Sequence, residues 1–109
     1  MSKIAYLDDE KELTNIFKLL FENTHHEVSV FNDETDAIAY CNCSPPDIFF
    51  VDFRLIHFTG AQVAAQVPSS IKVVLVTGDI TTDSKFSFDA IINKPFKLKE
   101  LTELVEQFS

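Results

Sequence analysis

The run from Ile48 to Asp52 constrains the fold of this chain more than any other stretch. Four large apolar residues in succession suit a strand that is covered on both faces, as at the centre of a parallel sheet flanked by helices. The run ends in a carboxylate, and open α/β sheets carry their sites at the carboxyl ends of their strands. Asp52 is therefore the first candidate for a reactive group.

The composition favours one folded domain, residues 1–109, and argues against several classes of partner. A chain of 109 residues that is 46% hydrophobic is long enough for one core and unlike a disordered segment. Its net charge is −8 and its basic residues are scattered, which disfavours binding to nucleic acid or to an anionic membrane. Because the first residues enter a strand-like run and no apolar stretch reaches transmembrane length, we expect a cytoplasmic protein.

The two cysteines give little support to a metal site or a disulfide. Cys41 and Cys43 are too close for an easy disulfide. With His25 and His26 they could offer four zinc ligands, but the spacing matches no common zinc arrangement. We expect Cys41 on the buried face of a helix and Cys43 in the loop that follows it.

Strand-like and helix-like runs alternate along the chain. Strands are expected at residues 4–7, 27–31, 47–52, 71–76 and 90–92. Helices are expected at 10–23, after an Asn32 cap up to the prolines at 45–46, at 60–67 and at 97–108. The first helix should bury the apolar residues that recur on one face, namely Leu13, Ile16, Phe17, Leu20 and Phe21. This alternation predicts a parallel sheet with helices on both faces.

The segment between Thr77 and Lys94 breaks the alternation. It should hold a fourth helix, yet residues 80–88 show little helical periodicity and many side chains that prefer caps or turns. We expect this helix to be missing or reduced to one turn.

Polar residues that suit one reaction follow four of the five strands. Carboxylates held close together repel one another, and Mg²⁺, which prefers oxygen ligands, relieves that repulsion. A hydroxyl and an ammonium on the other side would contact phosphoryl oxygens, so the set suits phosphoryl transfer to a carboxylate. The residues are Asp8 and Asp9 after the first strand, Asp52 after the third, Thr77 after the fourth and Lys94 after the fifth.

These motifs resemble the receiver domain of bacterial two-component response regulators, and the resemblance covers the whole chain. They are Asp8-Asp9-Glu10, Val51-Asp52, Gly60, Thr77-Gly78 and Lys94-Pro95-Phe96. Any one is weak, but all five in the right order are specific. The resemblance implies a flavodoxin-like doubly wound sheet of five parallel strands in the order 2-1-3-4-5.

The resemblance also assigns roles to residues. Asp52 would accept a phosphoryl group from a phosphohistidine on a sensor histidine kinase or a histidine phosphotransfer protein. Asp9, Asp52 and the backbone carbonyl of Arg54 would bind Mg²⁺ directly, and Asp8 would act mostly through water.

Two further residues would contact the product. Thr77 would donate a hydrogen bond to the aspartyl phosphate, and Lys94 would pair with it. In this family the bond between such a lysine and the following proline is usually cis, which we expect at Lys94-Pro95. The signal would then pass by protein contacts to a downstream partner, with no output domain on this chain.

Three features depart from the family pattern. Ile91 stands where an aromatic residue usually moves inward on phosphorylation, Ile56 replaces a common proline, and the fourth helix is reduced. One hypothesis is that Ile80, Phe86 and Phe88 cover the sheet in place of that helix and leave a patch for a partner or a homodimer.

A second hypothesis concerns the path of hydrolytic water beside the acceptor. Arg54 and Asp79 could pair across the phosphoryl group and slow its loss, although an exposed ion pair is weak. His57 lies in the same loop as Arg54 and is better explained as an exposed loop residue.

Three alternatives remain open from the sequence. A phosphatase that forms an aspartyl phosphate would want a second aspartate two residues after the nucleophile, where this chain has Arg54. A receiver-like binding module that works without phosphorylation fits the altered switch region but not the intact site. A flavin-binding protein of similar topology is disfavoured, because no phosphate-binding loop follows the first strand.

Overall fold

The apolar runs form five parallel strands in the computed structural model, which describes residues 2–53, 59–78, 88–94 and 96–108. The strands are β1 (Lys3–Leu7), β2 (Glu27–Phe31), β3 (Ile48–Asp52), β4 (Lys72–Thr77) and β5 (Ala90–Asn93). The helices are α1 (Lys11–Leu20), α2 (Glu34–Cys43), α3 (Gly60–Ala64) and α4 (Leu98–Phe108).

The strand order is β2-β1-β3-β4-β5, with every neighbouring pair parallel. This confirms the predicted doubly wound, flavodoxin-like sheet. The strand that ends in Asp52 lies at its centre, between β1 and β4, and each of its five residues is buried. Burial on both faces explains why this strand reads as a continuous apolar run rather than an alternating one.

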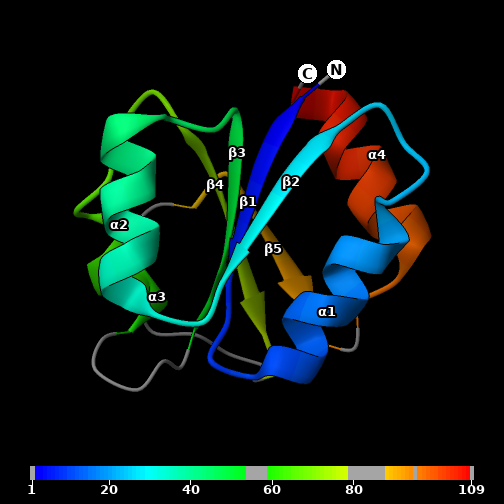
Figure 1. Cartoon of the computed structure of the whole chain (residues 1–109), viewed down its shortest axis with the longest axis horizontal. Coiled ribbons are helices and arrows are strands. Elements are labelled where there is room, and N and C mark those ends of the chain that lie inside the picture. Colours follow the sequence, from blue (N-terminus) through cyan, green and yellow to red (C-terminus); the bar gives the residue numbers. More distant parts are fainter. Residues whose placement is uncertain (1, 54–58, 79–87, 95, 109) are drawn as a thin grey trace.

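Two cores lie on opposite faces of the sheet (Figure 1). On one face α1 and α4 pack over alternate strand residues that include Tyr6 and Phe50. On the other, α2 and α3 cover the intervening residues, among them Phe49 and Leu75. Because successive side chains in a strand point to opposite faces, each central strand contributes to both cores.

Helix α1 is shorter than expected, and the prediction that Ile16 is buried is wrong. The side chain of Phe17 is fully buried, whereas Ile16 is 47% exposed. The apolar stripe is centred on Phe17 and on Phe21, just past the end of the helix. Ile16 is turned about 100° from Phe17 around the helix axis and so lies at the margin of the stripe.

The expected cap of α2 is also wrong by one residue. Asp33 is the N-cap, and its side chain accepts a hydrogen bond from the Asp36 amide at 3.1 Å. The side-chain Nδ2 atom of Asn32 instead donates to the backbone oxygen of Asp8 at 2.8 Å and to the Thr14 hydroxyl at 3.1 Å. Asn32 therefore ties the end of β1 to α1.

The remaining elements follow the expected order with small shifts. Cys41 is buried in α2 as predicted, but Cys43 is the exposed last residue of that helix rather than part of a loop. Helix α3 ends at Ala64, three residues early, and Val67 still packs against the core. The predicted loss of the fourth helix concerns residues 79–87, which lie outside the described residues.

Within the described ranges, no helix combines the length and the apolar character that crossing a membrane requires. The cytoplasmic location expected from the sequence stays a prediction.

Candidate functional site

The carboxyl ends of four strands meet at one edge of the sheet. Asp52 and Thr77 are the last residues of β3 and β4. The amide of Asp8 continues the sheet beyond β1 by donating to the Phe31 oxygen at 3.0 Å. The amide of Lys94 donates to the Thr77 oxygen at 2.7 Å, which holds the residue after β5 against the end of β4.

A cavity of about 310 Å³ opens at this edge. It is lined by Asp9, Glu10, Asp52, Phe53, Thr77, Gly78 and Lys94. Four of the residues predicted from the sequence are therefore brought together in one cavity. Glu10 and Phe53 also line the cavity, although the sequence analysis gave them no role. The position of Glu10 in the acidic run at residues 8–10 was the sequence signal that could have identified it.

Lys94 bridges two carboxylates. Its ammonium nitrogen lies 2.7 Å from Asp52 Oδ1 and 3.0 Å from Asp8 Oδ2. The Asp8 side chain is fully buried and that of Asp52 is 8% exposed, so both contacts are shielded from water. Such charge-assisted hydrogen bonds are stronger than those between neutral groups.

Asp8 is anchored by a residue that sequence reasoning missed. The hydroxyl of Tyr6 donates to Asp8 Oδ2 at 2.5 Å, and the amide of Glu10 donates to Asp8 Oδ1 at 3.0 Å. Asp8 does not line the cavity, unlike its neighbour Asp9. An aromatic residue inside an apolar strand reads as core, so only the position of Tyr6 two residues before Asp8, on the same face, pointed to this contact.

Asp52 and Asp9 have raised pKa values. Burial raises the pKa of Asp52 from 3.8 to about 6; the hydrogen bond from Lys94 opposes this rise and the charge of Asp8 adds to it. Burial and the charge of Asp8 also raise the pKa of Asp9. For Lys94, burial lowers the pKa, but the hydrogen bonds to Asp52 and Asp8 outweigh burial and leave the pKa raised. The negative charge here exceeds what one ammonium neutralises.

The donor set fits a hard divalent cation. Carboxylate oxygens of Asp8, Asp9 and Glu10 lie within 4.8 Å of one another, and Asp52 and Asp9 line the same cavity. Oxygen ligands of this kind are preferred by Mg²⁺, which is commonly held by one or two carboxylates together with water and phosphate.

The alternative zinc arrangement is not supported. Cys41 packs in the core beneath α2, and the Nδ1 atom of His26 accepts a hydrogen bond from the Ser2 amide at 3.0 Å. The cluster of possible metal ligands found among the described residues is the acidic one at residues 8–10.

Several predicted contributors lie outside the described residues: Arg54, Ile56, His57, Asp79, Ile80, Phe86 and Pro95. The predicted backbone ligand, the ion pair beside the acceptor and the cis peptide bond therefore stay predictions. Phe88 is half-buried against the core on the α2 face, as the covering hypothesis expects. Ile91 is 54% exposed.

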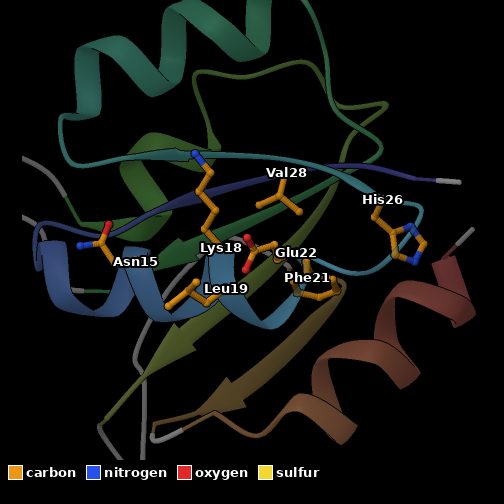
Figure 2. Close-up of a pocket in the computed structure, with 7 residues that line it drawn as sticks. All are labelled: Asn15, Lys18, Leu19, Phe21, Glu22, His26 and Val28. Carbon is orange, nitrogen blue, oxygen red and sulfur yellow. The ribbon is translucent and has the colours of Figure 1, made fainter.

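A larger cavity, about 560 Å³, lies between α1 and β2, away from the acidic edge (Figure 2). Side chains from α1, the turn after it and β2 surround it, namely Asn15, Lys18, Leu19, Phe21, Glu22, His26 and Val28. Its lining carries one ammonium, from Lys18, and one carboxylate, from Glu22, but it has neither the further carboxylates nor the hydroxyl side chain that line the smaller cavity. Size alone therefore does not identify the reactive site.

Comparison with known protein families gives one match over almost the whole chain. A model of the family described as "Response regulator receiver domain" matches residues 4–106. The chain is 29% identical to the regulatory protein VanRc of Enterococcus gallinarum over 111 residues, which cover 95% of this chain and 48% of VanRc. It is 28% identical to the transcriptional regulatory protein TrcR of Mycobacterium tuberculosis, over 91% of this chain and 42% of TrcR. The chain thus spans about half the length of these curated relatives.

Solved structures share the fold at lower identity. A CheY-like receiver domain from Methylobacillus flagellatus superposes with a TM-score of 0.88 at 20% identity and covers 100% of this chain and 99% of its own. The response regulator TrrA of Thermotoga maritima, solved in complex with Mg²⁺-BeF, gives 0.88 at 22% identity, with 100% of both chains covered.

Proposed function

The chain belongs to the response regulator receiver domain family, and we propose that it accepts a phosphoryl group on Asp52 from a phosphohistidine. The donor would be a sensor histidine kinase or a histidine phosphotransfer protein, and the signal would pass on through protein contacts. The observation that carries this proposal is the pairing of Asp52 with the Lys94 ammonium at 2.7 Å beside a cavity also lined by Asp9 and Thr77.

In the proposed step an Oδ atom of Asp52 forms a bond to phosphorus while the bond between phosphorus and the donor imidazole nitrogen breaks. The electron pair of that bond stays with the imidazole, so no oxidant or further reactant is needed. Bound Mg²⁺ would supply charge neutralisation for the phosphoryl oxygens. Asp9 and Asp52 would hold the ion with the backbone carbonyl of Arg54, and Asp8 would act on it mostly through water.

Thr77 and Lys94 would act on the transferred group from the other side. The Thr77 hydroxyl would donate a hydrogen bond to one phosphoryl oxygen. The Lys94 ammonium would leave Asp52 and contact a second phosphoryl oxygen. Donors held in place before the reaction stabilise developing charge without reorganising. These groups would support the chain's own phosphorylation and its own slow dephosphorylation. They would not turn over a separate substrate as a conventional enzyme does.

A magnesium-dependent phosphorylation assay tests the proposal. The chain is incubated with a small-molecule phosphodonor and Mg²⁺, and its intact mass is measured. We expect wild type to gain one phosphoryl group and Asp52→Asn to gain none. Asp47→Asn is the matched control, because Asp47 precedes the same strand that Asp52 ends and lies far from the cavity.

Two results would contradict the proposal. Equal uptake by wild type and Asp52→Asn would remove Asp52 from its role. No uptake by wild type from either a small-molecule donor or a phosphorylated phosphotransfer protein would favour the receiver-like binding module instead.

The proposal also includes a homodimer or partner patch on the face near Phe88. Light scattering of the phosphorylated and unphosphorylated chain tests the homodimer; a strict monomer at high concentration in both states rules it out.

A further inference from the structure

The hydrogen bond from Tyr6 to Asp8 gives the site a feature that its acceptor, hydroxyl and lysine do not explain. The Tyr6 side chain is fully buried, and its hydroxyl donates to Asp8 Oδ2 at 2.5 Å. Its ring lies against Phe17 with centroids 4.5 Å apart and meets Phe96 edge-on at 5.9 Å. Because these rings hold the Tyr6 ring in place, the direction of its hydroxyl is fixed by packing.

Asp8 is fully engaged by groups of the protein itself. Oδ2 accepts from Tyr6 and from the Lys94 ammonium at 3.0 Å, and Oδ1 accepts from the Glu10 amide at 3.0 Å. The carboxylate is fully buried and is not part of the cavity wall, although Asp9 and Glu10 beside it are. Its position therefore differs from that of Asp9, which faces the space where an ion would bind.

We propose that Tyr6 is a positioning residue that keeps Asp8 withdrawn from the cavity and thereby weakens Mg²⁺ binding at Asp9 and Asp52. The inference rests on magnesium binding, which is part of the proposed function. A carboxylate attracts a nearby cation less when its charge is already taken up by close donors. Without the hydroxyl, the buried anion loses a hydrogen bond that water does not replace and turns toward the cation instead.

The test compares Mg²⁺ dissociation constants measured by calorimetry for wild type, Tyr6→Phe and Tyr40→Phe, without any phosphodonor. Tyr6→Phe removes only the hydroxyl. Tyr40 is the chain's other tyrosine, and its hydroxyl contacts Ser29 away from the site, so Tyr40→Phe is the matched control. We expect the dissociation constant to fall about tenfold in Tyr6→Phe, a change of the size that partners of metal ligands produce, and to stay unchanged in Tyr40→Phe.

A second pair of variants separates positioning from a general effect on folding. In an Asp8→Asn background, Tyr6→Phe should no longer change the dissociation constant, because the charge on which it acts is gone. Alone, Asp8→Asn should weaken Mg²⁺ binding less than Asp9→Asn does. The comparison of Asp8→Asn with Asp9→Asn tests the withdrawn position of Asp8, on which the inference depends, even if Tyr6→Phe does not fold.

Equal or weaker Mg²⁺ binding by Tyr6→Phe, or an Asp8→Asn loss as large as that of Asp9→Asn, would overturn the inference. Either result leaves the proposed phosphorylation of Asp52 standing, because phosphoryl uptake is tested separately by intact mass. Failure of phosphoryl uptake would refute the proposed function without altering the ratio of the dissociation constants. A wild-type chain that binds no Mg²⁺ would overturn the inference and the metal-binding part of the function together.

Discussion

Strands β1 and β3 have charged residues at both ends. The burial and the pairing of these residues differ between the two ends. At the amino ends, Asp47 is exposed and accepts from the Lys3 amide at 2.7 Å, while the Lys3 ammonium donates to the Ser44 oxygen at 2.9 Å. At the carboxyl ends, Asp8 and Asp52 are buried and share the ammonium of Lys94. One end balances charge in contact with water, and the other concentrates negative charge away from it.

At the carboxyl ends the fold contains a destabilising arrangement of charges that the amino ends avoid. Buried like charges are costly, and neighbouring β-strands do not require them, since the amino ends of the same strands avoid them. The excess of carboxylates is the property that would attract an incoming cation. Each of the following predictions changes one end and takes the other as its control.

Removal of the Lys94 ammonium should have the largest effect. Lys94→Ala leaves Asp8 and Asp52 buried without their cation, so the free energy of unfolding at pH 7 should fall by about 3–5 kcal/mol. Lys3→Ala, at the other end, should cost about 1 kcal/mol or less. Urea unfolding in the presence of a chelator measures both. Equal losses would show that the two ends do not differ in the way that their burial indicates.

The pH dependence of stability should come next in size. The folded-state pKa of Asp52, about 6, is above its ordinary 3.8, so the folded chain binds that proton more tightly than the unfolded chain. The resulting stabilisation is fully present below about pH 4 and is lost as the pH rises to about 6, a change of up to about 3 kcal/mol.

Denaturation of the metal-free protein between pH 4 and 7 checks this slope. Asp52→Asn should flatten it relative to wild type, because the asparagine at position 52 does not titrate. Asp47→Asn should leave it as steep as in wild type. A slope that survives in Asp52→Asn would assign the proton to another group.

Added Mg²⁺ should produce the smallest effect and should act only at the carboxyl ends. At ten times its dissociation constant, an ion that binds only the folded state raises the unfolding free energy by about 1.4 kcal/mol. Asp9→Asn should lose this stabilisation and Asp47→Asn should keep it. Thermal denaturation with and without Mg²⁺ measures the difference, and stabilisation retained in Asp9→Asn would place the ion elsewhere.

The sequence predicted the sheet and most of the site because both depend on simple patterns. An apolar run followed by a polar residue marks the carboxyl end of a buried strand, and parallel strands bring those ends together. Asp52, Thr77 and Lys94 were found in this way. Glu10 and Tyr6 were missed because what they do depends on which direction a side chain faces.

Tertiary contacts also decided the details that the sequence left ambiguous. Asn32 and Asp33 are both good caps, and only the use of the Asn32 amide by Asp8 and Thr14 leaves the cap to Asp33. Ile16 has the spacing of a core residue, but the stripe centred on Phe17 and Phe21 leaves it at the surface. Spacing along a helix gives the buried face to within about one residue on either side, and packing sets its centre.

The shared ammonium of Lys94 has a consequence for how the site changes state. Because Lys94 is paired with two carboxylates, it can leave Asp52 for an incoming phosphoryl oxygen while it stays paired with Asp8. The Lys94 ammonium would therefore keep an anionic partner throughout the exchange. This avoids the desolvation penalty of an unpaired buried cation, which would otherwise add to the barrier. Asp8 would thus remain the counter-ion of Lys94 during the proposed exchange.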